Sequence, residues 1–381
     1  MAQTSNLISI KKSKEYHSSE TSLVIRYKKI LYRLLLLIFA SILLTGSSVN
    51  RISHLLVEQK SFIPIGKSRP VKVFILAGQS NAVGYNHIRE LHYQSDNVKQ
   101  ILNKQSNILF WPGSNAKPGS ANIWTKLQIG LSEISINEPY KDGCFGPEIG
   151  FSLGIQKVLP EEKIAVIKYA EGGTGIARSV DYQDYIPALK DFDDKGRNWY
   201  PPTEGKVAGL LYKRLIENIQ NALAALKSQG LDYEIDGFLW MQGEHEAGIS
   251  KKMAGDYGKL LTIFRESIRH DLTIKELPFI VGEINSHTWA FADIARNNQA
   301  AACQNDPHGL LIKTIDLSRG SIGGAAHFDA DGMLTLGERF ANGMLLFLKG
   351  KDEPKPTVTI LKKNPDNCTD FVRILTSFMG N

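Results

Sequence analysis

Cysteine is scarce in this chain of 381 residues, with Cys144, Cys303 and Cys368 as the only three. They are too few and too widely scattered to form a zinc site or a disulfide framework. In an exported protein one pair could be oxidised and would leave an odd thiol, whereas three inert thiols packed in the interior fit the pattern equally well. Both alternatives exclude a fold held together mainly by disulfides.

Charge is also sparse, at 22% of the residues, while 43% are hydrophobic. This composition argues against a disordered or fibrous protein. The formal net charge is +6, but seven basic and two acidic groups lie within the first fifty residues, so the remainder is almost neutral. A nucleic-acid-binding protein needs a basic surface on its folded part, and we therefore expect no nucleic-acid binding.

The longest apolar run, residues 34–44, is shorter than the ~20 residues of a membrane-spanning helix. Basic residues precede it from Arg26 to Arg33, and small residues follow it at 45–48, which is typical of a secretory signal. An uncleaved anchor over residues 30–45 and a buried core helix are the alternatives. We expect residues 1–48 to be a signal peptide or N-terminal membrane anchor of an exported protein (secreted, periplasmic or cell-surface), and residues 49–70 to be a linker.

The rest of the chain has no internal repeat and alternates short apolar runs, rich in β-branched residues, with longer helical patterns. Apolar runs without polar alternation suit strands that are buried on both faces. The predicted strands are residues 71–77, 164–169, 235–240, 279–283 and 311–315, and the predicted helices 147–159, 210–229, 254–272, 291–305 and 333–348. This order predicts an α/β domain over 71–350, with three layers (α/β/α) and a roughly five-stranded parallel sheet, followed by a tail over 351–381.

Polar residues capable of chemistry follow several of the predicted strands. They are GQSN at 78–81, EGGTG at 171–175, QGEHE at 242–246 and, after the last strand, HFD at 327–329. Right-handed crossovers place the carboxyl ends of parallel strands at one edge of the sheet, where such folds bind ligands. We therefore expect these four segments to converge on one site.

Ser80 and His327 are the residues in these segments that fit nucleophilic catalysis. Ser80 stands where a strand ends, Gly78 permits a sharp turn there, and an imidazole is the usual base for a serine hydroxyl. Taken singly, Ser80 has the alternative of capping the next helix, and His327 that of an ordinary loop histidine. Their occurrence together with the two glycine-containing segments favours catalysis.

The four segments together resemble those of the SGNH/GDSL hydrolase superfamily. The closest resemblance is to its sialate O-acetylesterase-domain and carbohydrate esterase family 6 branch, which includes acetyl xylan esterases. The matching blocks are GQSN (78–81), GPE (146–148), EGGT (171–174), WMQGE (240–244) and HFD (327–329), in this order. The resemblance covers about residues 70–348 and implies a flavodoxin-like α/β fold.

The resemblance also implies a role for each site residue. Ser80 would be the nucleophile and His327 its base, while the oxyanion would bind to the backbone N–H groups of Ser80 and of Gly172 or Gly173 and to the amide of Gln242. Gly172 and Gly173 have the alternative of a tight turn, and Gln242 that of tying two loops together.

The resemblance does not assign the acid of the implied triad directly, because Gly324 stands where relatives often have an aspartate. Glu244 would take its place, as a glutamate does in some relatives, or it would only bond loop amides. Asp316 is a remote option, and Asp329 is expected to cap the following helix. A pair of serine and histidine can act without an acid, at a lower rate.

The resemblance predicts a serine esterase that removes O-acetyl groups from a carbohydrate, an acetylated polysaccharide or a sialic-acid-type sugar. No metal or organic cofactor is expected, since the histidine and glycine spacings match no metal or nucleotide motif. A polysaccharide O-acetyltransferase with the same site and a carbohydrate-binding protein on a lapsed esterase fold are the alternatives. Aromatic residues between the blocks could line a sugar cleft, although packing is the default for each; they are Tyr85, Trp111, Trp124, Trp199, Tyr200 and Trp289.

Overall fold

The computed structural model describes residues 69–87, 90, 108–113, 121–131, 143–184, 196–285, 289–321 and 324–348. All of them belong to the second of two compact units, which begins at Ser68. The predicted signal or anchor, all but the last two residues of the predicted linker, the tail over 351–381 and Cys368 lie outside the described residues. Among the helices of these described ranges, none is both long and apolar enough to span a bilayer.

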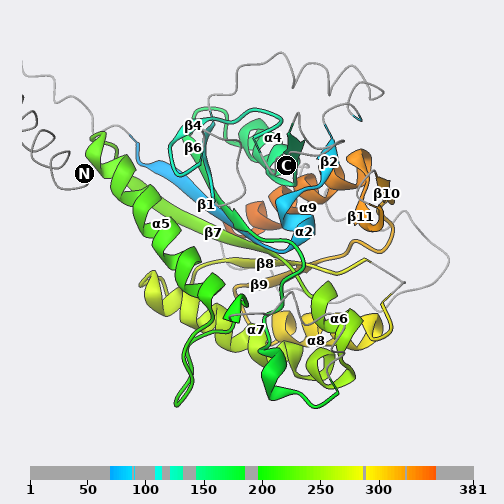
Figure 1. Cartoon of the computed structure of the whole chain (residues 1–381). Helices are drawn as coiled ribbons and strands as arrows, with labels where there is room; N and C mark the ends of the chain where they lie inside the picture. Colours follow the sequence, from blue (N-terminus) through cyan, green and yellow to red (C-terminus); the bar gives the residue numbers. More distant parts are fainter. Residues whose placement is uncertain are drawn as a thin grey trace, which may run out of the picture. The chain divides into compact units, whose positions relative to one another are not determined.

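A seven-stranded sheet forms the middle of the described unit (Figure 1). Its order is β4-β3-β6-β1-β7-β8-β9, and all neighbouring pairs are parallel except β3 with β4. The strands are β1 (Val71–Gly78), β3 (Leu109–Pro112), β4 (Thr125–Lys126), β6 (Ile164–Ala170), β7 (Tyr233–Met241), β8 (Phe279–Gly282) and β9 (Gly309–Ile312). The α/β class and all five predicted strands are confirmed, while the short edge strands β3 and β4 extend the sheet beyond the prediction.

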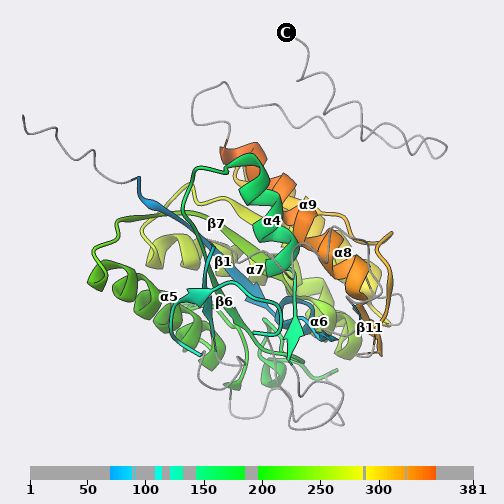
Figure 2. The same cartoon turned by 90° about the horizontal axis from the view of Figure 1, so that it is seen from above.

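Helices cover both faces of the sheet. The side chains of β1 point alternately to the two faces, and each set packs against a different layer of helices. Val73 and Ile75 pack toward α5 (Leu210–Ser228) and α7 (Lys251–Asp271), and Phe74 and Leu76 pack toward the opposite layer. That layer consists of α4 (Glu148–Val158) and α9 (Ala330–Leu348), which lie side by side, with α5 across the sheet from them (Figure 2). Two apolar layers, one on each face, exclude water from the whole length of β1.

Two further elements complete the α7 side. The helix α8 (Ala292–Gln304) packs on α7, and the short helix α6 (Glu244–Ile249) contacts both of them. On the other side of the site, the strands β10 (Arg319–Ser321) and β11 (Gly324–Phe328) form an antiparallel pair, as do β2 (Asn86–His87) and β5 (Cys144–Phe145).

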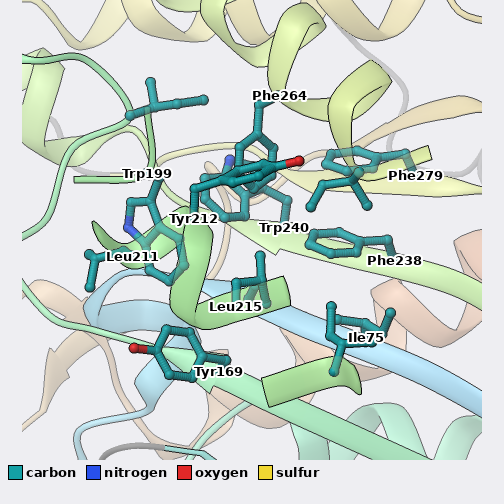
Figure 3. Close-up of a cluster of buried hydrophobic side chains, with 14 of the residues drawn as sticks. Ile75, Tyr169, Trp199, Leu211, Tyr212, Leu215, Phe238, Trp240, Phe264 and Phe279 are labelled. Atoms are coloured by element: carbon teal, nitrogen blue, oxygen red, sulfur yellow. The ribbon is translucent and has the colours of Figure 1, made fainter. Parts of the chain in front are cut away.

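Aromatic side chains dominate the core between the sheet and α7 (Figure 3). The Trp240 ring lies 4.5 Å from the Phe264 ring and perpendicular to the Trp199 ring at 5.4 Å, and all three are fully buried. Trp240 Nε1 donates a hydrogen bond to the Tyr257 hydroxyl, which in turn donates to the carbonyl of Gln242. This core therefore supports the backbone at the carboxyl end of β7, where the predicted site begins.

The helices α4 and α9 approach each other through glycines. A Cβ added to Gly150 would lie 2.1 Å from the carbonyl oxygen of Leu334, and one added to Gly337 would lie 2.4 Å from that of Pro147. Both distances are far inside van der Waals contact with backbone atoms, which cannot move aside as a side chain can. The contact between these two helices thus requires small residues at both positions.

We expect Gly337→Ala to lower the free energy of unfolding by about 1–3 kcal/mol, because overpacking forces the two helices apart. Gly255→Ala is the matched control, since it lies inside α7 and a Cβ there would meet nothing within 4 Å. That control should be neutral or stabilising by up to about 1 kcal/mol, because alanine favours the helix. Urea denaturation of both variants measures the difference, and equal stability of the two would contradict this account of the α4–α9 contact.

Candidate active site at the end of strand β1

The candidate site lies where the strand order reverses. After β1, the chain forms β3 and then β6 on one side of β1. It then forms β7, β8 and β9 on the other side. In the register, Gly78 at the end of β1 pairs with Ala170 of β6 and with Met241 of β7. The segments after these three strands therefore start at the same level of the sheet, at its switch point. The predicted convergence of residues 78–81, 171–175 and 242–246 is confirmed.

The turn that carries Ser80 depends on close backbone contact with β7. Gly78 has a φ of +142°, and a Cβ there would lie 2.0 Å from the carbonyl oxygen of Met241, so only glycine fits. The same carbonyl accepts a hydrogen bond from the N–H of Gln79. Ser80 then begins the four-residue helix α2 (Ser80–Val83). The N-cap residue is Gln79 and no side chain caps this helix, so Ser80 is not the helix cap that its position alone allowed.

Asn81 ties this turn to the strand that carries His327. Its Nδ2 donates to the carbonyl of Ala326 at 3.4 Å, and its Oδ1 accepts from the N–H of Phe328 at 3.3 Å. These two groups belong to the residues on either side of His327 in β11. The residue after Ser80 is thus held against both neighbours of His327, although almost 250 positions separate the two segments in the chain.

Tyr85 contacts both His327 and the glycine segment. Its ring meets the His327 ring edge-on, with the centroids 5.1 Å apart and the planes at 60°. Its hydroxyl oxygen lies over Gly172, only 2.4 Å from where a Cβ of that residue would be. Gly172 must therefore lack a side chain to admit the Tyr85 hydroxyl. Among the six aromatic residues considered for a sugar cleft, Tyr85 is at the candidate site.

The glycine segment after β6 is a turn that hydrogen bonds from neighbouring side chains hold in place. Gly173 has a φ of +70°, which glycine adopts without strain, so the tight turn expected as the alternative role is present. The Thr174 hydroxyl donates to the carbonyl of Glu171 and accepts from Trp199 Nε1. Downstream, Glu246 Oε1 accepts hydrogen bonds from the N–H groups of residues 176 and 177. These contacts fix the segment over α6 and leave Gly172 and Gly173 half-buried at the site.

Gln242 is fully buried, and its amide nitrogen is already bonded inside the protein. Its Nε2 donates to Gln79 Oε1 at 3.2 Å, to the carbonyl of Thr174 at 3.1 Å and to Glu246 Oε2 at 2.6 Å. Two N–H groups thus face three acceptors within the protein. Its Oε1 has no hydrogen-bond partner within the described part of the chain. These contacts match the alternative role, in which Gln242 ties strand-end loops together; its predicted oxyanion role stays a prediction.

Glu244 bonds the side-chain amide of Asn81. Its Oε1 accepts from Asn81 Nδ2 at 2.7 Å, while its buried Oε2 has no partner among the described residues. Burial raises the pKa of this carboxyl to about 7, against the opposing effect of the Asn81 hydrogen bond. Asn81 thus links Glu244 to the strand of His327 indirectly. The prediction that Glu244 is the triad acid stays a prediction.

The far end of α2 is fixed by a buried ion pair. Lys168 of β6 donates to the carbonyl of Val83 at 2.6 Å and to Glu148 Oε2 at 2.7 Å, and both charged side chains are more than nine-tenths buried. Glu148 Oε1 in turn accepts from the N–H of Gly146. The GPE block at 146–148 therefore supports the helix α2 that begins at Ser80, a role that its sequence did not reveal.

The remaining predicted residues have structural contacts. Asp329 accepts from the N–H of Gly332 at 2.8 Å and so caps α9 as predicted. Asp316 pairs with Arg339 at the surface, and Gly324 is the first residue of β11.

Cys144 and Cys303 are buried free thiols. Trp111, Trp199 and Tyr200 pack in the core, and Trp124 partly so. Nowhere in the described ranges do three potential metal-ligating side chains cluster.

The fold and the site together define an α/β enzyme of the kind that places a hydroxyl-bearing turn at the switch point of a parallel sheet. The family described as "Carbohydrate esterase, sialic acid-specific acetylesterase" matches residues 70–346. This match covers most of the chain, and the chain belongs to this family. It is accordingly a carbohydrate acetylesterase, a carboxylic ester hydrolase, and the resemblance inferred from its sequence blocks is confirmed.

The chain is also similar to individual known proteins. The chain is 25% identical to a probable carbohydrate esterase of Arabidopsis thaliana over 214 aligned residues. The aligned part is 55% of this chain and 68% of the Arabidopsis protein. The X-ray structure of that Arabidopsis protein aligns with a TM-score of 0.51 and 22% identity, over 72% of this chain and 98% of the other, and shares the fold. A carbohydrate acetylesterase from Xanthomonas citri aligns more weakly, with a TM-score of 0.48 and 15% identity, over 74% of this chain and 57% of the other.

The raised pKa of Glu244 predicts a pH-dependent contribution to stability. A carboxyl whose pKa rises from 4.5 unfolded to about 7 folded binds its proton more tightly in the native state, so it stabilises the fold at low pH. That contribution is lost as the pH rises from about 4.5 through 7. Glu244→Gln should therefore gain stability relative to the wild type between pH 5 and pH 8, by on the order of 3 kcal/mol at most.

Denaturation by urea at both pH values measures this change. Asp316→Asn is the control, because Asp316 is exposed and its pKa is lowered by Arg339 rather than raised. A Glu244→Gln variant whose stability relative to the wild type is the same at pH 5 and pH 8 would contradict the burial of a neutral carboxyl here.

Proposed function

We propose that this carbohydrate acetylesterase works through a serine nucleophile, Ser80, with His327 as its base. The substrate would be an acetylated polysaccharide or a sialic-acid-type sugar. The observation that carries the proposal is the pair of hydrogen bonds from Asn81 to the residues on both sides of His327. They bring the turn of Ser80 to the strand of His327 at the switch point, where α/β folds bind ligands.

The reaction would proceed in two halves. Ser80 Oγ attacks the acetyl carbonyl carbon while His327 takes the hydroxyl proton, and the tetrahedral intermediate collapses as His327 returns that proton to the departing sugar oxygen. Water then attacks the acetyl-serine ester and gives its proton to His327. Acetate departs as Ser80 recovers the proton, so the enzyme returns to its starting state.

The oxyanion would be held by backbone groups at two of the strand ends. The N–H of Ser80 stands at the start of α2, and the N–H of Gly172 or Gly173 belongs to the turn that Thr174 and Glu246 hold in place. Fixed donors of this kind stabilise charge as it develops, without the reorganisation that water would need. The support for this part of the proposal is the common level of the two strand ends in the sheet.

Glu244 would act through Asn81 as a positioning group. Its carboxyl bonds the amide that holds β11, so it would help to set the position of the strand that carries His327.

Ser80→Ala and His327→Ala should each lower kcat/KM for p-nitrophenyl acetate by about 10³-fold or more, because the members of such a pair act as one unit. The double variant should be no worse than either single variant. Ser318→Ala is a matched control, since that hydroxyl bonds Asp329 at the helix cap and not the proposed site. Esterase activity that survives both substitutions would assign the chemistry to other residues.

We further propose that the chain is exported, with residues 1–48 as a cleaved signal or an N-terminal anchor. The support is the order of basic, apolar and small residues in this segment. Fractionation of producing cells should recover the protein outside the cytosol, with a new N-terminus after the small residues at 45–48, or in the membrane fraction at full length. A soluble, full-length cytosolic chain would contradict export.

A further inference from the structure

We propose that Arg197 determines substrate specificity by binding the carboxylate of an acidic sugar that carries the acetyl group. The proposal rests on the site at Ser80 given above, and it selects acidic sugars, of the sialic-acid or uronic-acid type, over neutral glycans. Such a sugar has its carboxylate and its acetyl ester on different carbon atoms. Arg197 therefore needs no contact with the reacting ester.

The first observation is the place of the Arg197 side chain. Its Nε donates to Glu171 Oε1 at 2.7 Å, and its Nη2 donates to the same oxygen. The N–H of Glu171 in turn donates to the carbonyl of Gly78 at 3.0 Å, and Gly172 is the next residue in the chain. The guanidinium group thus bonds the residue that begins the glycine segment, beside the strand end that leads to Ser80.

The second observation is that the segment of Arg197 is anchored to the glycine segment at a further point. The N–H of Trp199 donates to the carbonyl of Gly175 at 2.8 Å, and Trp199 Nε1 donates to the Thr174 hydroxyl at 2.7 Å. Trp199 is fully buried, so both bonds are shielded from water. Arg197 bonds the first residue of the segment 171–175 and Trp199 the last two, which fixes the guanidinium group beside this segment.

The third observation is that the guanidinium group has an exposed edge. The Arg197 side chain is 42% exposed, whereas that of its partner Glu171 is only 11% exposed. The bonds to Glu171 use Nε and Nη2, and Nη1 has no hydrogen bond to any residue in the described ranges. A guanidinium group carries five N–H donors in a planar fork. The edge formed by Nη1 and Nη2 can therefore bind a second carboxylate through two parallel hydrogen bonds, while Glu171 holds the group in place.

Arg197→Gln tests the proposal with O-acetylated N-acetylneuraminic acid and its methyl ester, which keeps the acetyl group and loses the charge. We expect the wild-type kcat/KM for acetate release to be at least about tenfold higher for the acid than for the methyl ester. Arg197→Gln should lower kcat/KM for the acid about 10- to 100-fold, mainly by raising KM, because the lost bonds hold a charged group of the bound substrate. Its kcat/KM for the methyl ester and for p-nitrophenyl acetate should stay within threefold of the wild type.

Three further variants separate substrate binding from a structural role. Arg339→Gln is the matched control, since that guanidinium group pairs with Asp316 at the surface, and it should keep the wild-type preference for the acid. Glu171→Gln leaves the Arg197 fork in place and should also keep this preference. The double variant Glu171→Gln/Arg197→Gln leaves no unpaired buried carboxylate and should show the same loss as Arg197→Gln alone. A loss that is equal for the acid, its methyl ester and p-nitrophenyl acetate in both Arg197→Gln variants would overturn the inference.

Acetylated galacturonan and acetylated xylan identify the source of the carboxylate. Acetate release from galacturonan that depends on Arg197 would point to a uronic-acid polymer, and the same dependence for the neuraminic acid alone would point to a sialic-acid-type sugar. Xylan deacetylated faster than both acidic substrates, or a wild type that does not distinguish the acid from its methyl ester, would overturn the role of Arg197.

The Ser80→Ala variant keeps the two proposals distinguishable. Activity on the acid that Ser80→Ala abolishes and Arg197→Gln preserves would overturn the role of Arg197 alone. Activity that survives Ser80→Ala would instead overturn the serine site on which this inference rests.

Discussion

The side chain of Asn81 is the contact on which the candidate site depends. One amide bonds three groups: the carboxyl of Glu244 at the start of α6 and the backbone on both sides of His327 in β11. The segments it joins come from opposite ends of the domain, and strand pairing alone does not connect β11 to the central sheet. An amide suits this position because it donates and accepts at once, which neither a carboxylate nor an ammonium group does. Without it, the turn of Ser80 and the strand of His327 would be held together by side-chain packing, such as that of Tyr85 on His327, and not by these hydrogen bonds.

Around this contact the protein buries polar groups that bond one another rather than a ligand. Gln79, Gln242 and Glu246 form one network, and Lys168 with Glu148 forms a second beneath α2. Buried polar groups are costly unless they are bonded, so such networks favour a single arrangement of the loops. The aromatic core reaches the same place through Tyr257, which donates to the carbonyl of Gln242. The loops around the candidate site are thus held in place from beneath.

The sequence predicted the architecture well because its signals are local. Buried parallel strands are apolar on both faces, and each predicted strand occurs in the sheet. The strands β3 and β4 were missed because two to four residues carry too little pattern to be recognised. The contacts of Asn81 and Lys168 were missed for another reason: each depends on a partner from a distant segment. Glu244 likewise contacts Asn81, a partner that no spacing along the chain discloses.

The sequence by itself determined the fold class, the family and the segments that meet at the sheet edge, because strand patterns and strand-end motifs are written in consecutive residues. Only the tertiary structure decided which polar groups of these segments bond one another. Hydrogen-bond partners are chosen in space: the amide of Gln242 donates to acceptors from three segments, and the side chain of Asn81 bonds both Glu244 and the backbone of β11. A motif names a residue type at a position, and the fold determines which partner that residue meets.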